Sequence, residues 1–402
     1  MSNQAEAFSR SRVVVVGGGY AGVMAANRLT KREDIEITLV NPRDHFVERI
    51  RLHQLAGGTS EAVVAYTDVL SPRVRLVVDT VASIDAGVRT ITLGSGQEMT
   101  YDYLVYAVGS AGTTRVAGAA EHAYGVSTYE EATRLKAALD TAPADAPVIV
   151  VGGGPTGIEV SSELAEAGGN VTLVCGDRLG PWLHEKGRVA AERDLRRLGV
   201  GIIEDARVAE VLAGGVRLDN GRELPSTLTI WTAGFAAPDL ARASGLSTDE
   251  LGRLVTDETL TSVDDDRIIA TGDAAAPSGQ AYRMSCQAAN QLGPLAAETV
   301  LARLAGATPE AVSIGFVGQC ISIGRGLGLL NFARRDDSAV AARLRAVPAA
   351  KVKELICRST VWAMAMEARR PGSAIGFKDR SRAARVQAAA VTPPDRDPSR
   401  LG

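Results

Sequence analysis

The chain has 402 residues, of which 46% are hydrophobic and 42 are glycine, and its formal net charge is −3. Two or three domains are expected at this length, and the composition is that of a globular protein. The four cysteines lie at least 34 positions apart, with no C-x-x-C and no Cys/His cluster. This spacing argues against a zinc or iron–sulfur site, and the weak net charge gives no sign of a nucleic-acid partner.

The segment before Ser11 is polar and acidic, so it does not resemble a signal peptide. No run approaches the roughly 18 apolar residues of a membrane span. We therefore expect a cytoplasmic protein with free thiols. If it meets a membrane, we expect it to lie on the surface as a peripheral protein.

Strands and helices alternate along the first three quarters of the chain. In the first unit, the patterns predict strands at 13–16, 35–40, 73–78, 90–93 and 101–108, and a helix at 20–31. In the second unit, they predict strands at 148–151, 170–174 and 200–203, a last strand-like run at 228–234, and helices at 156–168 and 187–198. This alternation is typical of parallel, doubly wound α/β sheets.

A G-x-G-x-x-G motif follows the first strand of each unit. The first reads Val-Val-Val-Val-Gly17-Gly-Gly19-Tyr20-Ala21-Gly22, and the second reads Val-Ile-Val-Val-Gly152-Gly-Gly154-Pro-Thr156-Gly157. The first glycine permits the tight turn, the second admits a pyrophosphate, and the third lets helix and strand pack closely. Because each motif joins a strand to a helix, the chain is predicted to bind two dinucleotides.

Residues 255–306 carry a Gly-Asp box, Ile-Ile-Ala-Thr-Gly272-Asp273, but no glycine motif of their own. We therefore predict that they complete the first unit and that the second unit is inserted into it. The predicted fold is α/β, with two Rossmann-like domains and a C-terminal α+β section. The expected boundaries are 1–120 with 246–306, then 121–245, then 307–378, and a disordered tail at 379–402.

This arrangement resembles the flavoprotein oxidoreductases with two dinucleotide-binding domains, the pyridine nucleotide-disulfide oxidoreductase superfamily. The resemblance implies that FAD binds the first motif and that NADH or NADPH binds the inserted domain. Ala107, Gly109 and Gly234 end the strands that look like the two junction motifs of that superfamily. Asp273 would hold the ribityl chain, since a carboxylate accepts hydrogen bonds from hydroxyls.

The chain differs from the disulfide reductases of this superfamily, because residues 41–49 contain no cysteine pair. It more closely resembles the type II NADH:quinone oxidoreductases. His45-Phe46 loosely matches a loop of that group, and Cys286-Gln287-Ala-Ala-Asn-Gln291 matches its quinone motif except at the cysteine. Gln287 and Gln291 lie four apart on one helical face. They can hydrogen-bond a flavin or quinone carbonyl, or they form a capping or solvent-facing pair.

Four other positions are assigned by the same resemblance. Asn41 ends the second strand, where an acid usually binds the adenosine ribose, and Arg43 lies nearby. Val81 would contact adenine through its backbone, or it is an ordinary strand valine. Glu159 would orient the nicotinamide carboxamide or relay a proton, although a first-turn glutamate is also favoured by the helix dipole alone.

The choice between NADH and NADPH depends on the end of the second strand of the inserted unit. Cys175 stands where an NAD-specific site carries an acid, so no carboxylate repels a 2′-phosphate. Arg178 can pair with that phosphate, and Asp177 can instead serve the NAD ribose. We predict weak discrimination, with a slight preference for NADH.

The C-terminal section is basic, with 13 Lys and Arg against 5 Asp and Glu from residue 339 onwards. Such a section can face a membrane surface or an acidic protein, or form a solvated tail. One helical stripe, flanked by basic residues, comprises Val352, Leu355, Ile356, Ser359, Trp362, Ala363 and Met366. It is either an interfacial anchor, a packing helix or a homodimer contact.

The leading functional hypothesis is an FAD-dependent NAD(P)H:quinone oxidoreductase at the membrane surface. One alternative is a soluble reductase that serves a small redox protein or a biosynthetic substrate. A second is a sulfide:quinone reductase, for which only Cys286 and Cys320 could stand beside the flavin. A third is a non-enzymatic NAD(P)H-sensing flavoprotein similar to apoptosis-inducing factor.

Overall fold

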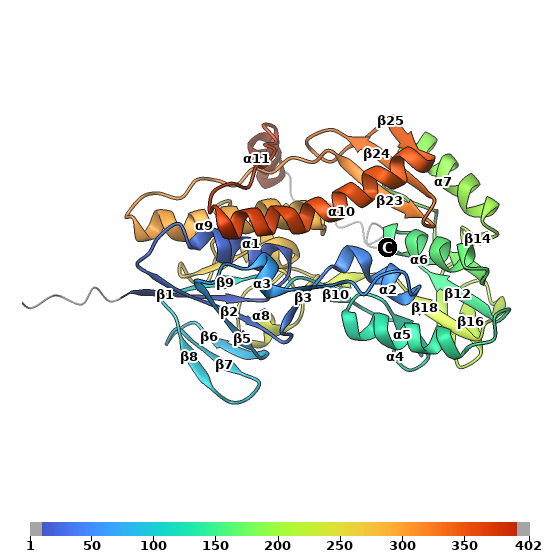
Figure 1. The fold of residues 1–402 in the computed structure, drawn as a ribbon, viewed down its shortest axis with the longest axis horizontal. Helices are drawn as coiled ribbons and strands as arrows, with labels where there is room; N and C mark the ends of the chain where they lie inside the picture. Colours follow the sequence, from blue (N-terminus) through green and yellow to red (C-terminus); the bar gives the residue numbers. More distant parts are fainter. Residues whose placement is uncertain (1–9, 392–402) are drawn as a thin grey trace, which may run out of the picture.

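The computed structural model describes residues 10–391. These residues form two parallel five-stranded sheets, three antiparallel three-stranded sheets and three two-stranded sheets. Figure 1 shows the two parallel sheets side by side, with the three-stranded sheet of the C-terminal section and the long helix α10 (Ala346–Arg369) along one side of them. The predicted fold class is confirmed.

The first parallel sheet has the order β21-β9-β1-β2-β5. Its strands are β1 (Ser11–Val16), β2 (Ile35–Asn41), β5 (Val74–Val78), β9 (Tyr103–Tyr106) and β21 (Ile268–Ala270). Helix α1 (Tyr20–Leu29) is buried along its whole length between this sheet and α9 (Cys286–Leu304). The two helices approach closely because α9 has Gly293 at the contact, where a Cβ would lie 2.3 Å from Ala21 O.

The second unit is inserted into the first, as predicted. After the second sheet is complete, β21 returns to pair in parallel with β9. The chain crosses between the units through β10 (Ala111–Gly112) and β19 (Phe235–Ala236), which pair antiparallel. These two short strands follow the predicted junction motifs, which end at Gly109 and Gly234.

The second parallel sheet has the order β11-β18-β12-β13-β14. Its strands are β11 (Ala123–Gly125), β12 (Pro147–Val151), β13 (Asn170–Val174), β14 (Gly201–Ile203) and β18 (Leu228–Trp231). The helices α5 (Tyr129–Thr141), α6 (Pro155–Glu166) and α7 (Glu185–Arg197) belong to this unit. Strands β12 and β18 are buried, as expected for parallel strands covered on both faces.

The smaller elements connect or extend these sheets. In the first unit they are β3 (His45–Val47), η1 (Arg49–Arg51), α2 (Leu52–Ala56), β4 (Val63–Ala65), α3 (Tyr66–Val69), β6 (Val81–Asp85), β7 (Thr90–Leu93) and β8 (Glu98–Thr100). Later elements are α4 (Ala119–His122), β15 (Val208–Leu212), β16 (Gly215–Leu218), β17 (Glu223–Pro225), α8 (Leu240–Ala243), β20 (Leu254–Thr256), η2 (Gly272–Ala274) and β22 (Ala275–Pro277).

The C-terminal section is α+β. Strands β23 (Gly318–Ile323), β24 (Leu327–Ala333) and β25 (Ala339–Arg345) form the three-stranded sheet of this section, and α10 (Ala346–Arg369) packs on β24, α1 and α3. The predicted stripe is divided between two environments. Val352, Ile356, Ser359 and Ala363 line a cavity, whereas Leu355 and Trp362 are each 65% exposed.

The sequence predicted a disordered tail from Asp379 onwards. The structure corrects this prediction, because it places helix α11 at Arg382–Val391. Arg382 is 4% exposed and anchors this helix. Its guanidinium pairs with both carboxylate oxygens of Glu258, at 2.8 and 2.9 Å, and stacks on the ring of Tyr282 at 4.0 Å. Residues 392–402 of the expected tail lie outside the described residues.

Candidate active site

A cavity of about 1210 Å³ lies between the two parallel sheets and extends to α10. This volume exceeds the range of roughly 300–1,000 Å³ that is usual for small-molecule sites. Its wall includes the first glycine loop, the Gly-Asp box, the start of α6, strand β23 and one face of α10. The cavity therefore has room for a ligand of dinucleotide size, and all three sections of the protein contribute to it.

The first glycine loop is shaped for a phosphate. Gly17 has a φ of +102°, and a Cβ on Gly22 would lie only 1.8 Å from Gly17 O. Helix α1 begins after Gly19 with no side-chain cap, so the N–H groups of its first turn are available to an anion. Gly17, Gly19, Tyr20 and Ala21 all line the cavity. This loop fits the pyrophosphate of a dinucleotide.

Asn41 supports that loop directly. Its Oδ1 accepts a hydrogen bond from Gly18 N at 3.0 Å, and its Nδ2 donates to Arg43 O at 2.8 Å. Arg43 in turn reaches α5, where its Nε donates to Glu130 Oε1 at 2.7 Å. Both residues line the cavity together with Val81. The polar atoms of Asn41 already have protein partners, which the sequence motif did not indicate.

Asp273 lies at the opposite end of this wall, in η2. Its Oδ2 accepts from Ser110 Oγ at 2.7 Å, and its Oδ1 accepts from Ser285 N at 3.0 Å. Arg49 Nη1 lies 3.5 Å from the carboxylate. Ala107, Gly109 and Gly272 line the same part of the cavity. An ionised carboxylate held in this way can still accept hydrogen bonds from ligand hydroxyls.

The second glycine loop repeats the geometry of the first. Gly152 has a φ of +123°, and a Cβ on Gly157 would lie 1.9 Å from Gly152 O. Gly154 precedes α6, again without a side-chain cap, and Pro155 occupies the first turn. Thr156 lines the large cavity. Gly234, with a φ of +80°, follows β18 at the crossing between the units.

The repeat also places Cys175. Gly17 N donates to Val40 O at 2.9 Å, and Gly152 N donates to Val174 O at 2.8 Å. Cys175 is therefore the structural equivalent of Asn41. It is 9% exposed, so its thiol offers little to a ribose.

The charged residues that follow Cys175 are exposed and paired. Arg178 Nη2 contacts Glu185 Oε2 at 2.9 Å, and Asp177 Oδ2 accepts from Arg207 Nη2 at 2.8 Å. A ligand phosphate at this position would compete with Glu185 and Asp177 for the two arginines. Arg207 was not identified from the sequence.

Gln287 and Gln291 both line the cavity, and their amides hold the wall together. Gln291 donates from Nε2 to Gln287 O at 3.0 Å and accepts at Oε1 from Phe377 N at 2.8 Å. With its amide oriented to satisfy both groups, Gln287 donates to Gly318 O and accepts from Val317 N, each at 3.1 Å. The pair thus joins α9 to the start of β23 and to the segment after α10.

Glu159 is buried at the cavity wall, in contact with two residues that sequence reasoning missed. Its Oε1 is 2.8 Å from Lys353 Nζ on α10 and also accepts from Ser322 N at 3.0 Å. Its Oε2 is 3.5 Å from Nδ1 of His53 on α2. One residue of this His53–Glu159–Lys353 triad comes from each section of the protein, and all three line the cavity.

The triad is charged at two of its three members. Burial raises the pKa of Glu159, but Lys353, His53 and the Ser322 N–H lower it more, so the net pKa lies below the usual value. Burial lowers the pKa of Lys353, but Glu159 reverses this and leaves it raised. Burial lowers the pKa of His53 to about 4, so this imidazole is neutral near neutral pH.

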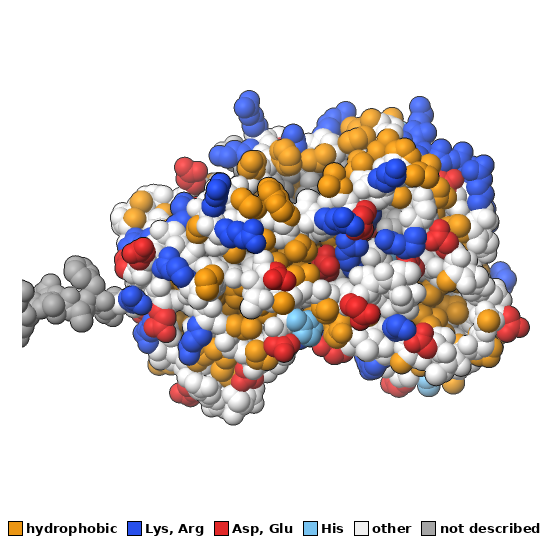
Figure 2. All heavy atoms as spheres, in the orientation of Figure 1, with side chains coloured by type: hydrophobic (Ala, Val, Ile, Leu, Met, Phe, Trp, Pro, Cys, Tyr) orange, Lys and Arg blue, Asp and Glu red, His pale blue; other side chains and the backbone are white. Residues whose placement is uncertain are grey.

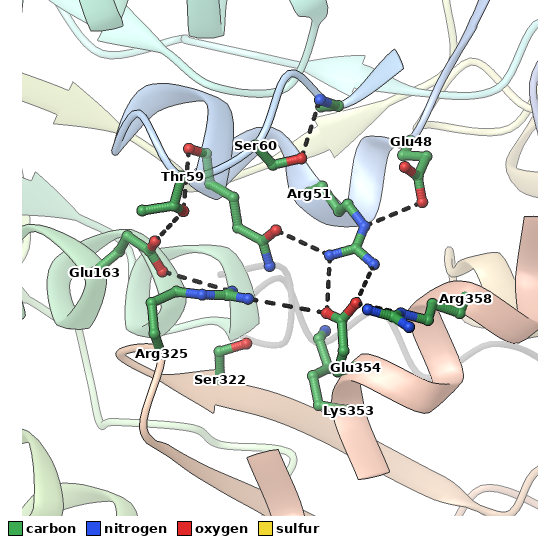
Figure 3. Close-up of polar contacts among 12 residues, drawn as sticks. Glu48, Arg51, Thr59, Ser60, Glu163, Ser322, Arg325, Lys353, Glu354 and Arg358 are labelled. Atoms are coloured by element: carbon green, nitrogen blue, oxygen red, sulfur yellow. Dashed lines mark hydrogen bonds and ion pairs between the residues drawn. The ribbon is translucent and has the colours of Figure 1, made fainter. Parts of the chain in front are cut away.

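A second layer of charges separates the triad from solvent. Arg51 binds both carboxylate oxygens of Glu354 at 3.0 and 2.9 Å, and Arg358 donates to the same carboxylate at 2.9 Å. Arg325, in the β23–β24 turn, lies 4.0 Å from Glu163 and 3.9 Å from Glu354. Figure 3 shows these residues converging from η1, α6, the β23–β24 turn and α10 beside Lys353. The three sections are thus joined around the triad.

The sequence carried only a weak signal for the triad. Lys353 looked like a flanking cation of an amphipathic helix, although it shares helical spacing with the buried residues Cys357, Thr360 and Met364. His53 lies in a five-residue helix without a motif. The helical spacing puts Lys353 on the buried face of the helix, and a buried lysine usually pairs with an acid. This was the one sequence feature that indicated such a pair.

Comparisons with known proteins agree with this architecture. Residues 11–293 match the family model described as pyridine nucleotide-disulphide oxidoreductase. An NADH dehydrogenase-like protein of Mycobacterium tuberculosis is 33% identical over 72% of this chain and 80% of its own. A type II NADH:quinone oxidoreductase of the same organism is 29% identical over 75% and 74%.

Among solved structures, NDH2 from Plasmodium falciparum in complex with NADH aligns with a TM-score of 0.76 at 14% identity. The alignment covers 90% of this chain and 97% of that one, and at such low identity it shows the fold alone. The family match spans well over half of the residues, from the first strand to the middle of α9. The chain therefore belongs to the pyridine nucleotide-disulphide oxidoreductase family, and it is an oxidoreductase.

Proposed function

We propose that this protein is an FAD-dependent NADH:quinone oxidoreductase that works at a membrane surface. The observation that carries the proposal is the single cavity that joins the first glycine loop, Asp273 and Thr156 of the second loop to the apolar face of α10. The relatives include type II NADH:quinone oxidoreductases, which supports the same reaction.

The residues divide the work between binding and positioning. Gly17, Gly19 and Gly22 cradle the FAD pyrophosphate, and Asp273 accepts hydrogen bonds from the ribityl chain. Gly152, Gly154 and Gly157 hold the nicotinamide nucleotide. When bound, the flavin supplies the two-electron chemistry. Glu159 orients the nicotinamide carboxamide from the wall of the cavity, where Lys353 keeps it ionised.

The quinone contacts the side of the cavity formed by α10 and β23. Ile321 and Leu330 of the C-terminal three-stranded sheet line this side together with Val352, Ile356 and Ala363 of α10. An apolar wall suits a quinone ring and its lipid tail. Gln287 and Gln291 act here by fixing the position of that wall, since their amides are engaged with backbone groups.

The membrane contact is the outer face of α10 and the segment after it. Val347, Leu355, Trp362 and Ile375 are 51%, 65%, 65% and 89% exposed. Figure 2 shows hydrophobic side chains interspersed with basic ones on this face. A basic, apolar helix surface of this kind suits the interface of an anionic bilayer. No helix within residues 10–391 is long and apolar enough to cross the membrane.

The nicotinamide nucleotide is proposed to be NADH, with weak discrimination against NADPH. The position equivalent to Asn41 is the buried Cys175, so no carboxylate repels a 2′-phosphate. Arg178 and Arg207 are near, but each is already paired. We expect the kcat/KM values for the two nucleotides to differ by less than about a hundredfold, or roughly 2.7 kcal/mol; a larger ratio would refute this assignment.

An anaerobic stopped-flow experiment tests the function. The yellow protein is mixed with NADH or NADPH, and loss of flavin absorbance is followed; a menaquinone analogue is then added. Rapid return of the absorbance supports quinone reduction. Loss of absorbance without its return would favour a soluble redox protein or a biosynthetic substrate as the electron acceptor. Flotation with anionic vesicles tests whether the protein binds a membrane surface, and this binding should be lost in Leu355→Asp and Trp362→Asp. Sedimentation analysis tests whether the same face forms a homodimer.

A further inference from the structure

The end of β13, where the adenosine half of a nicotinamide nucleotide is expected, lacks the usual acid. In folds of this kind, a carboxylate at the end of the second strand binds the ribose 2′-hydroxyl. Here Cys175 occupies that position. Burial, and after it the carboxylates of Glu204 and Glu192, raise the pKa of the Cys175 thiol to about 12. The thiol is therefore uncharged near neutral pH, and an acid at this site must come from another segment.

The neighbouring strand β14 is followed by such an acid. Strands β13 and β14 pair in parallel as far as Val174 and Ile203, and Cys175 N donates to Ile203 O at 2.8 Å. Glu204 is the next residue after β14, so it lies beside Cys175 at the carboxyl edge of the sheet, where neighbouring strands are about 4.8 Å apart. Its carboxylate is also the charged group with the largest effect on the Cys175 thiol. Glu204 thus brings a carboxylate next to the position that lacks one.

The turns after the two strands hold this carboxylate in place. Gly176 and Ala206 form an antiparallel bridge, which joins the two turns into one lip, residues 175–180 and 204–207. Within the lip, Glu204 Oε1 accepts a hydrogen bond from Leu179 N at 2.7 Å. Among residues 10–391, its Oε2 takes part in no hydrogen bond, and the side chain is 25% exposed. The backbone therefore positions one carboxylate oxygen and leaves the other available to a ligand.

The lip lies directly against the second glycine loop. Gly180 N donates to Gly153 O at 2.9 Å, and a Cβ on Gly153 would lie 2.9 Å from both Arg178 O and Cys175 Cβ. A dinucleotide whose pyrophosphate rests on this loop places its adenosine ribose at the end of the second strand. That position is at the lip, so the ribose is expected beside the Glu204 carboxylate.

We propose that Glu204 is the residue that distinguishes NADH from NADPH in this protein. Its carboxylate accepts hydrogen bonds from the ribose 2′-hydroxyl of NADH and repels the 2′-phosphate of NADPH. The inference rests on the proposed function and deepens it, because it identifies an acid that favours NADH although position 175 carries none. Arg178 and Arg207 stand on the same lip, each paired with one exposed carboxylate. Their attraction for a phosphate opposes Glu204 and keeps the discrimination weak.

Anaerobic reduction of the flavin tests this role without any electron acceptor. The holoenzyme and its Glu204→Gln variant are mixed with a range of NADH or NADPH concentrations in stopped flow, and loss of flavin absorbance is followed. Glutamine keeps the oxygen that accepts from Leu179 N. An exposed contact between unit charges changes affinity by up to about fivefold, and a phosphate carries nearly two charges. We therefore expect the ratio of the NADPH to the NADH second-order rate constants to rise about tenfold.

Fragments without nicotinamide give a second readout. Adenosine 2′,5′-bisphosphate carries the 2′-phosphate, whereas adenosine 5′-phosphate carries the free hydroxyl. As competitors of NADH, the bisphosphate should bind about tenfold more tightly to Glu204→Gln than to the native protein, and the 5′-phosphate should bind no better. The matched control is Glu210→Gln, which removes a carboxylate paired with Arg217 elsewhere in the inserted unit. It should change neither the rate ratio nor the binding of either competitor.

Two results would overturn the assignment. One is a rate ratio in Glu204→Gln that stays within about twofold of the native value. The other is an equal rise in Glu210→Gln, which would mean that the overall charge of the unit acts and not a residue at the ribose. Native flavin that neither nucleotide reduces would instead overturn the proposed function, and this inference with it. A failure of quinone to reoxidise the flavin would overturn only the proposed acceptor.

Discussion

Replacement of Glu159 by glutamine should leave a buried lysine without its counter-charge. In the native protein, Lys353 Nζ lies 2.8 Å from Glu159, and the two side chains are 12% and 9% exposed. Glutamine keeps the shape of the side chain but removes the charge. Lys353 must then either remain charged in a poorly solvated site or lose its proton. Removal of one partner of a buried pair typically costs about 3–5 kcal/mol.

Deprotonation of Lys353 sets an upper limit on this cost. Starting from the ordinary pKa of 10.5, neutralising a lysine costs about 1.36 kcal/mol per pH unit, or about 4.8 kcal/mol at pH 7 and about 2 kcal/mol at pH 9. In the variant, burial depresses the folded pKa below the unfolded one. Its unfolded state therefore binds more protons, and its stability should rise with pH relative to the native protein.

Urea unfolding of the holoenzyme, followed by tryptophan fluorescence at both pH values, measures this difference. The control is the double variant Glu159→Gln/Lys353→Met, which replaces the charged pair with neutral groups and should recover most of the lost stability. If the free energy of unfolding falls by less than about 1 kcal/mol at pH 7, the pair contributes no more than a weak surface contact, and the reasoning is refuted. A penalty that grows with pH, or a double variant no better than the single one, would also refute it.

Three further changes test the cavity. Gly157→Ala would place a Cβ 1.9 Å from Gly152 O, so NADH should no longer bleach the flavin, whereas the FAD content of the purified protein stays normal. Asp273→Ala removes the acceptor held by Ser110 and Ser285, and the FAD content after gel filtration should fall. His53 has a folded pKa of about 4 against 6.5 unfolded; the melting temperature should therefore decrease from pH 6.5 towards 4, and less steeply in His53→Asn than in the native protein.

The glycine motifs made the fold and half of the site predictable. At Gly22 and Gly157 a Cβ would collide with the backbone, so only glycine fits and the motif can be recognised in the sequence. The insertion of one unit into the other was also predictable, because residues 255–306 lacked a motif of their own and β21 indeed returns to the first sheet. Local backbone constraints of this kind do not depend on distant residues.

The other half of the site depends on contacts between distant segments. His53, Glu159 and Lys353 meet although up to 300 positions separate them, and nothing in their local patterns requires it. The prediction of disorder was wrong for residues 379–391 for the same reason. The alanine- and arginine-rich composition of this segment was typical of disorder, yet Arg382 finds Glu258 and Tyr282 and folds α11 onto the first unit.

The triad also bears on how the protein can move. Glu159 belongs to the inserted unit and Lys353 to the C-terminal section, so a rotation of either section against the other would break a buried ion pair. Such a break costs about 3–5 kcal/mol, and the outer contacts of Arg51, Glu354 and Arg325 add to it. We therefore expect the three sections to keep their relative positions through the catalytic cycle. The nicotinamide nucleotide would enter a preformed site, and α10 would act as part of the active site as well as its cover.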